Sequence, residues 1–247
     1  SHVMLGDMRE ASGVLGSCLD TLDTEEGRRL HAFGGSTFSF ACTFRAWALA
    51  ELGQLEEAKA IGKAGFKNAR ALDQPYSILV STFGYSHALI RRGHWEKAAE
   101  ILDVGREQVG LYSVGAGGTW LFARRALVAA HMGDAALADL MIEQANAVVS
   151  SSVTDTFYEV LIAEAELRLG RTIAAAERAR SAAATALEGG EVAAAAWANL
   201  ILAEALNVLG QGDGPEAQSA LSQASKLAGQ RGLIPLAERA AALHIIK

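Results

Sequence analysis

The sequence predicts an all-α protein, a stack of antiparallel helix pairs with about twelve helices in total. Its 247 residues are 51% hydrophobic and include only three prolines, while alanine is abundant, so a large core and helices are both favoured. Runs of Val, Ile, Thr and aromatic residues that alternate with polar residues are absent, so no convincing strand is expected. The third observation is a repeat, in which a glycine and an alanine recur at a fixed spacing along the chain.

The repeat is organised around turn glycines. Each is followed five residues later by an alanine, or seven residues later in the last unit, where two residues are inserted. Glycine just past the end of a helix can take the left-handed conformation that closes the helix. Each unit is therefore predicted to be a helix, a glycine turn and a second helix. The glycines are Gly6, Gly53, Gly93, Gly133, Gly170 and Gly210, and the last five are 40, 40, 37 and 40 residues apart.

Two further rows of small residues accompany the repeat. One row lies seven residues before each turn glycine and the other seven residues after each alanine. Small residues at matching offsets indicate that the two helices of each unit contact each other closely along one seam. The first row is Ala46, Ser86, Ala126, Ala163 and Ala203, and the second is Cys18, Gly65, Gly105, Ala145, Ala182 and Ala224.

The elements follow in order as one domain over 5–247. The opening Ser1-His-Val-Met4 is typical of an expression-tag remnant and is set aside. A helix over 7–21 is the second half of a unit whose first half is absent, which suggests a piece of a longer protein, and 22–36 is the longest connection. Gly115–Thr119 lacks the lysine and preceding strand of a phosphate loop, so a flexible connection is expected there. The predicted pairs are 37–52 with 54–72, 76–92 with 95–109, 118–132 with 134–149, 154–169 with 171–187, and 190–209 with 215–228, and a capping helix over 235–246 begins at Pro235.

The small residue, turn glycine, alanine, small residue arrangement resembles the tetratricopeptide repeat. The unit is longer than the usual 34 residues, and the large aromatic of the second helix is missing. The segment from His31 to Leu102 is also similar to the C-terminal helical repeats of bacterial multidomain signalling proteins that carry cyclase and ATPase domains. That similarity rests on Arg45-Ala-Trp-Ala-Leu-Ala-Glu-Leu-Gly53 and on Leu72-Asp-Gln-Pro75-Tyr-Ser. No cyclase or ATPase motif lies in this chain.

The resemblance implies a right-handed superhelix whose concave face, lined by the first helix of each unit, binds a protein or peptide segment. One position of that face carries Phe40, Val80, Trp120, Phe157 and Trp197 in successive units. Aromatic side chains there can anchor a partner or can fill the space between units, and the sequence leaves both alternatives open. The partner-binding residues carried over from the resemblance are Phe40, Trp47, Phe83, His87, Trp120, Leu127, Phe157, Glu164, Trp197 and Glu204.

Composition and charge exclude several other classes of function. The formal charge of -6, with both signs interspersed, argues against a nucleic-acid surface. No apolar run is long enough to span a membrane and no signal peptide is evident, so a cytoplasmic protein is expected. Cys18 and Cys42 are predicted to be reduced, buried thiols, which indicates a reducing compartment.

No motif predicts catalysis, a metal or a cofactor. The histidines lack the spacing of metal ligands, and no nucleophile elbow is present. The expected function is therefore a non-enzymatic scaffold or regulatory module of a signalling protein that binds a protein or peptide. The alternative is a domain of a bacterial regulator that senses a small-molecule effector. Apolar surface at the N-terminal half unit also favours self-association as a homodimer.

Overall fold

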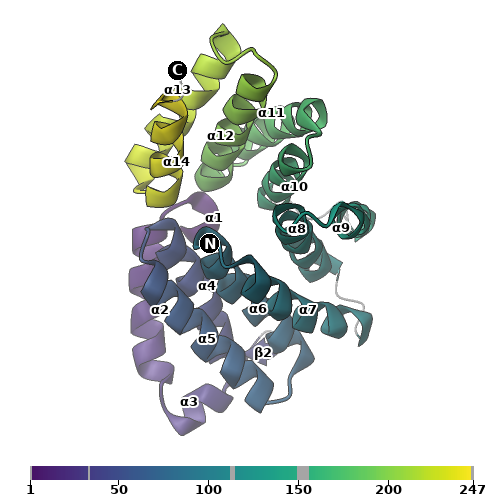
Figure 1. Cartoon of the computed structure of the whole chain (residues 1–247). Coiled ribbons are helices and arrows are strands. Elements are labelled where there is room, and N and C mark those ends of the chain that lie inside the picture. Colours follow the sequence, from purple (N-terminus) through teal and green to yellow (C-terminus); the bar gives the residue numbers. More distant parts are fainter. Residues whose placement is uncertain (1, 33, 112–114, 149–155, 246–247) are drawn as a thin grey trace.

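A computed structural model describes residues 2–32, 34–111, 115–148 and 156–245. The described part of the chain is all-α, with twelve helices of twelve or more residues that pack in sequential pairs (Figure 1). Every helix predicted from the repeat is present, and its described ends lie within three residues of the predicted ones. The long helices are α2 (Met8–Leu22), α4 (Thr37–Glu51), α5 (Leu55–Ala71), α6 (Pro75–Arg91), α7 (Trp95–Leu111), α8 (Gly115–His131), α9 (Ala135–Val148), α10 (Phe157–Arg168), α11 (Thr172–Glu188), α12 (Val192–Val208), α13 (Pro215–Arg231) and α14 (Ile234–Ile245).

The turn glycines have the conformation that the repeat requires. Gly53, Gly93, Gly133, Gly170 and Gly210 all have φ between 71° and 79°, a region that L side chains rarely adopt. Each lies between the two helices of one pair, and those two helices are in extensive contact: α4 with α5, α6 with α7, α8 with α9, α10 with α11, and α12 with α13. The prediction of a helix, a glycine turn and a second helix in each unit is therefore confirmed.

The predicted seams are buried. Ala46, Ala126 and Ala163 have no exposed surface, and the alanines that follow the turn glycines, such as Ala58 and Ala98, have none either. A methyl side chain is the largest group that such close crossings accept without displacing the neighbouring helix. The small residues thus set the distance between the paired helices.

Residues 22–36 hold short elements that the sequence did not reveal. Helix α3 (Glu25–Arg29) follows Thr24, whose side chain accepts a hydrogen bond from the Gly27 N–H at 3.0 Å. Strands β1 (His31–Ala32) and β2 (Gly35–Ser36) then pair antiparallel. Two residues per strand are too few to produce an alternating sequence pattern, which explains why no strand was expected. The prediction of a flexible connection at Gly115–Thr119 is also wrong, because α8 begins at Gly115 and these residues form its first turn.

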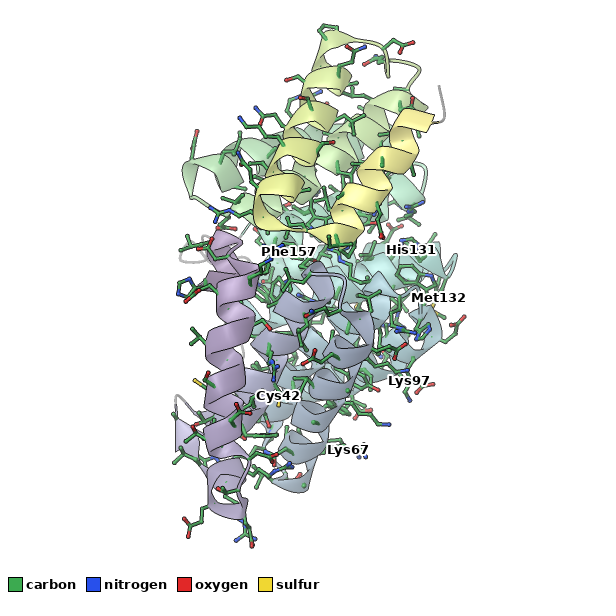
Figure 2. The ribbon with its side chains drawn as sticks, turned by 90° about the vertical axis from the view of Figure 1, so that its left-hand side faces the viewer. Cys42, Lys67, Lys97, His131, Met132 and Phe157 are labelled. Atoms are coloured by element: carbon green, nitrogen blue, oxygen red, sulfur yellow. The ribbon has the colours of Figure 1, made fainter. Side chains whose placement is uncertain are left out.

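Helices from the two ends of the chain are in contact. Helix α1 (His2–Leu5) packs against α12, and α14 packs against α4 (Figure 1). An ion pair joins Asp7, just before α2, to Arg231 at the end of α13. Val3 is 4% exposed, so this residue, although set aside above, is part of this contact. Phe157 lies at the level where the early and late helices meet, whereas Lys67 and Lys97 point outward at the edge of the molecule (Figure 2).

Within the described residues, no helix combines the length and the apolar character needed to cross a bilayer.

Candidate functional site

The side chains expected on a concave face meet inside the molecule. Trp47 lies at the centre, with its ring centroid 5.0 Å from those of Trp120 and Phe157 and 5.3 Å from that of His87. Of the ten predicted residues, three are half-buried, namely Phe40, Trp120 and Glu204. The other seven are buried: Trp47, Phe83, His87, Leu127, Phe157, Glu164 and Trp197.

This burial bears on the two alternatives left open for the aromatic row. Trp47 on α4, Trp120 on α8 and Phe157 on α10 contact one another, so they fill the space between units. The Arg124 side chain is 1% exposed. Its guanidinium lies 4.9 to 5.4 Å from the ring centroids of Trp47, Phe83 and Trp120, close enough for cation–π attraction that stabilises its positive charge. A partner could reach these side chains only if the helices separated, so binding through them stays a prediction.

Glu51 is the centre of a buried polar cluster. Its Oε1 accepts hydrogen bonds from His87 Nε2 at 2.7 Å and from Arg91 Nε at 3.0 Å, and its Oε2 accepts one from Trp197 Nε1 at 2.7 Å. The Arg91 guanidinium also lies 3.6 Å from the centroid of the Trp197 ring. Because these residues come from α4, α6 and α12, a single carboxylate joins the early helices to the late ones.

The charges of the cluster follow from its surroundings. Burial alone would raise the pKa of Glu51, but the Arg91 charge and the hydrogen bonds from His87 and Trp197 outweigh it and lower that pKa to about 2. Burial lowers the pKa of His87 to about 4, although its bond to Glu51 opposes the shift. At neutral pH Glu51 is therefore ionised, and His87 is neutral and donates its Nε2 hydrogen to the carboxylate.

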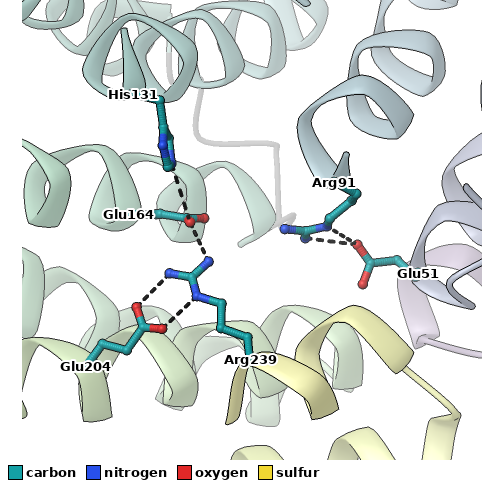
Figure 3. Close-up of polar contacts among 6 residues, drawn as sticks. All are labelled: Glu51, Arg91, His131, Glu164, Glu204 and Arg239. Carbon is teal, nitrogen blue, oxygen red and sulfur yellow. Dashed lines mark hydrogen bonds and ion pairs between the residues drawn. The ribbon is translucent and has the colours of Figure 1, made fainter. Parts of the chain in front are cut away.

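A second cluster holds the last helix. Arg239 on α14 makes two hydrogen bonds of 2.6 Å to Glu204 and one of 2.5 Å to Glu164 (Figure 3). His131 Nε2 lies 4.0 Å from Glu164. Burial alone would raise the pKa of Glu164, but the Arg239 charge outweighs it and holds that pKa well below its usual range. In both clusters each carboxylate accepts a hydrogen bond from an arginine, so no buried carboxylate is left without a cation.

Sequence reasoning placed His87, Glu164, Trp197 and Glu204 on a binding face. It missed Glu51 and Arg239, to which these four side chains bond, although one signal was present for Glu51. The position two residues before the turn glycine carries Glu51, Arg91 and His131 in three successive units. Opposite charges at equivalent positions of neighbouring units are typical of residues that meet in a stack. No comparable signal exists for Arg239, which lies outside the repeat.

An open apolar groove lies between α2 and α4 and has a volume of about 860 Å³. Val14, Cys18 and Leu22 line it from α2, and Phe40 and Phe44 line it from α4. Val14 is 48% exposed, and the Cys18 thiol is exposed as well. The prediction of two buried thiols is therefore correct for Cys42 and wrong for Cys18, because no described helix covers this face of α2.

A second pocket, of about 500 Å³, is polar. It lies between α10 and α11, where Arg178 pairs with Glu159 and Glu166. Three glutamates (Glu159, Glu166 and Glu177) and one arginine line it, so its lining carries a net negative charge. Among the described residues, no group of three or more His, Cys, Asp or Glu side chains is placed to hold a metal ion.

Comparisons of this sequence with protein-family models and with curated proteins find no match.

Proposed function

We propose that the chain is a protein-binding module of the tetratricopeptide-like kind, whose helix pairs wind into a right-handed superhelix. It captures a segment of a partner protein in the groove between α2 and α4. The observation that carries this proposal is the groove itself, an apolar surface that the chain leaves open while its other large apolar side chains are mostly packed. A contiguous exposed apolar surface with polar residues at its rim is one of the features by which interaction sites are recognised.

The chemistry of the groove favours a protein segment over a small molecule. Its polar lining consists of hydroxyl groups such as those of Ser17, Thr21 and Thr37, and no charged side chain is among the described residues that line it. A small-molecule site usually combines apolar walls with a few converging polar groups that fix the orientation of the ligand. An apolar effector remains the second candidate, because the volume of about 860 Å³ lies in the range of such sites.

The concave face is not the surface that we choose. Seven of its ten predicted binding residues are buried, and one of the other three, Phe40, lines the α2/α4 groove instead. Placement of this module in a bacterial signalling protein rests on the sequence resemblance alone, and its cytoplasmic location rests on the sequence analysis. Both belong to the proposal.

Photo-crosslinking from inside the groove tests the proposed function. A p-benzoylphenylalanine residue replaces Val14, which lines the groove, or Asp20, which is exposed on the same helix but does not line it. In cells that naturally make the protein, the probe at position 14 should give a protein adduct that the probe at position 20 does not give. The purified partner should then bind the wild-type chain at least about tenfold more tightly than Val14→Asp.

Two results would count against this function. An adduct at both positions, or at neither, would mean that the groove does not select a partner. A partner that binds Val14→Asp as tightly as the wild type would place the binding surface elsewhere. A thermal-shift screen distinguishes the second candidate, because a small ligand at about 100 times its Kd would stabilise the protein by about 2.7 kcal/mol.

A further inference from the structure

The repeat shows what fills a groove of this kind. Helix α4 lies between α5 and α6, where the Ser39 hydroxyl donates a hydrogen bond to the Gly65 carbonyl at 3.0 Å. A Cβ placed on Gly65 would lie only 2.5 Å from the Cβ of Cys42, and one on Gly84 would lie 2.2 Å from the Thr43 carbonyl oxygen. The first helix of a unit therefore fills the groove between its own second helix and the first helix of the next unit.

Helices α2 and α4 form the same kind of groove one unit earlier. Cys18 follows Gly6 by twelve residues, as Gly65 follows Gly53, so Cys18 is the equivalent of Gly65. By the same count, Phe44 is the equivalent of Gly84, since each lies nine residues before its turn glycine. The residues that contact α4 in the α5/α6 groove thus have equivalents that line the open α2/α4 groove.

We propose that the α2/α4 groove binds an amphipathic α-helix of a partner protein, in the position that α4 takes in the next groove. This inference rests on the proposed function and adds the structure of the bound segment. A helix of about four turns fits, because α4 itself has 15 residues. Apart from Ala32 of the two-residue strand β1, the lining residues belong to helices, whose backbone groups are bonded internally and offer no edge to an extended strand.

The side chain of Cys18 adds a condition on the sequence of the partner. At the equivalent glycines, a side chain of the facing helix occupies the space beside the glycine. Cys42 lies against Gly65, and Thr82 lies against Gly105, where an added Cβ would be 3.0 Å from Thr82 Oγ1. Cys18 already fills part of this space. The partner helix therefore needs glycine or alanine opposite Cys18, and a larger side chain there would push the helix out of the groove.

A second copy of the chain is a poorer occupant. The exposed large apolar side chains outside α2 are scattered over the described residues, for example Met132, Ile173 and the adjacent pair Val208 and Leu209. No other described helix presents a free apolar stripe that could enter the groove. An amphipathic helix of another protein has the free apolar stripe that the described helices of this chain lack.

The two cysteines provide the test. Cys18 is exposed in the groove, whereas Cys42 is buried and its pKa is raised to about 12 by that burial, so a thiol reagent near neutral pH modifies Cys18 selectively. The probes are alanine- and leucine-based amphipathic peptides of 17 residues, the length of α6. One has alanine along its central seam, one has leucine there, and one contains a central proline that prevents a continuous helix.

The alanine-seam peptide should slow the modification of Cys18 at least about tenfold at saturation, because it covers the thiol. The leucine-seam peptide should bind at least about tenfold more weakly, and the proline peptide should give no protection. Protection should be lost in Val14→Asp and kept in the matched control Asp20→Asn, which is on the same helix outside the groove.

The outcomes separate this inference from the proposed function. A partner that crosslinks from position 14, combined with no protection by the helical peptides, would overturn the helix and leave the function standing. Equal protection by the proline peptide would also overturn the helix, and equal affinity of the leucine-seam peptide would overturn the small-residue condition. Cys18 that is protected in the free protein and becomes reactive on dilution would show that a second copy occupies the groove, which overturns the proposal.

Discussion

At the scale of single residues, the buried pair of Glu51 and His87 makes stability depend on pH. The pKa of His87 is 6.5 in its ordinary state and about 4 in the fold, so between these values the unfolded chain binds a proton that the folded chain does not. The stability that depends on neutral His87 is therefore fully present above pH 6.5 and is lost as the pH falls toward 4. Glu51, lowered from 4.5 to about 2, adds a further loss in the window between those two values.

The substitution His87→Gln tests this origin of the acid sensitivity. Glutamine keeps an N–H donor for Glu51 but does not titrate. Between pH 6.5 and about pH 5.5, the free energy of unfolding of the wild type should fall by about 1 kcal/mol more than that of the variant. Urea unfolding at each pH measures the difference, and parallel profiles would mean that His87 is not the responsible group.

Substitution by alanine should have opposite effects on stability at two glycines, Gly84 and Gly13. Gly84→Ala on α6 places a Cβ 2.2 Å from the Thr43 carbonyl oxygen and should destabilise the fold by about 3 kcal/mol. Gly13→Ala on α2 meets nothing within 4 Å and should stabilise by about 0.5 kcal/mol, because alanine is the better helix former. Chemical denaturation compares the two variants, and changes of the same sign would contradict the described crossing of α4 and α6.

At the scale of elements, the interactions of Arg239 hold α14 against α10 and α12. Arg239→Ala leaves Glu164 and Glu204 without this cation and should cost about 3 kcal/mol of unfolding free energy. The matched control is Arg180→Ala, which breaks an exposed pair with Glu216 and should cost less than about 1 kcal/mol. Similar losses in the two variants would show that the clustered charges do not latch the last helix.

The helices and their pairing could be predicted because each unit repeats the same local requirement. A turn glycine with positive φ and a buried alanine such as Ala58 are needed wherever two helices cross closely, so the pattern appears in the sequence. The contact between Glu51 and Trp197 joins residues 146 apart and occurs once. A contact of that kind leaves no period in the sequence, which is why the closure between early and late helices could not be predicted.

The repeat pattern could predict only part of the candidate site. The aromatic row was found because Trp120, Phe157 and Trp197 recur at one repeat position, but its burial depends on how the units meet. Cys18 was assigned to the seam by its spacing. Whether a helix covers that seam is not encoded in Cys18 itself, so its exposure in the groove became evident only from the structure.

At the scale of the whole molecule, the same set of helices forms a packed interior and an open groove. Contacts between α1 and α12 and between α4 and α14 bury the aromatic interior. The α2/α4 groove stays open at the outside of the same assembly and presents its apolar lining to solvent. The described part of the chain therefore has a packed interior and an open apolar groove on α2 and α4, which we propose as the binding surface for a partner.

Hydroxyl-radical footprinting of the native chain, read by mass spectrometry, tests this central claim most directly. Radicals oxidise cysteine and tryptophan readily, so exposure decides which of these residues react. The account predicts rapid oxidation of Cys18, with Trp47 and Trp197, each 2% exposed, oxidised at least about tenfold more slowly. Oxidation of Trp47 and Trp197 as fast as that of Cys18 would show an open interior and contradict the account.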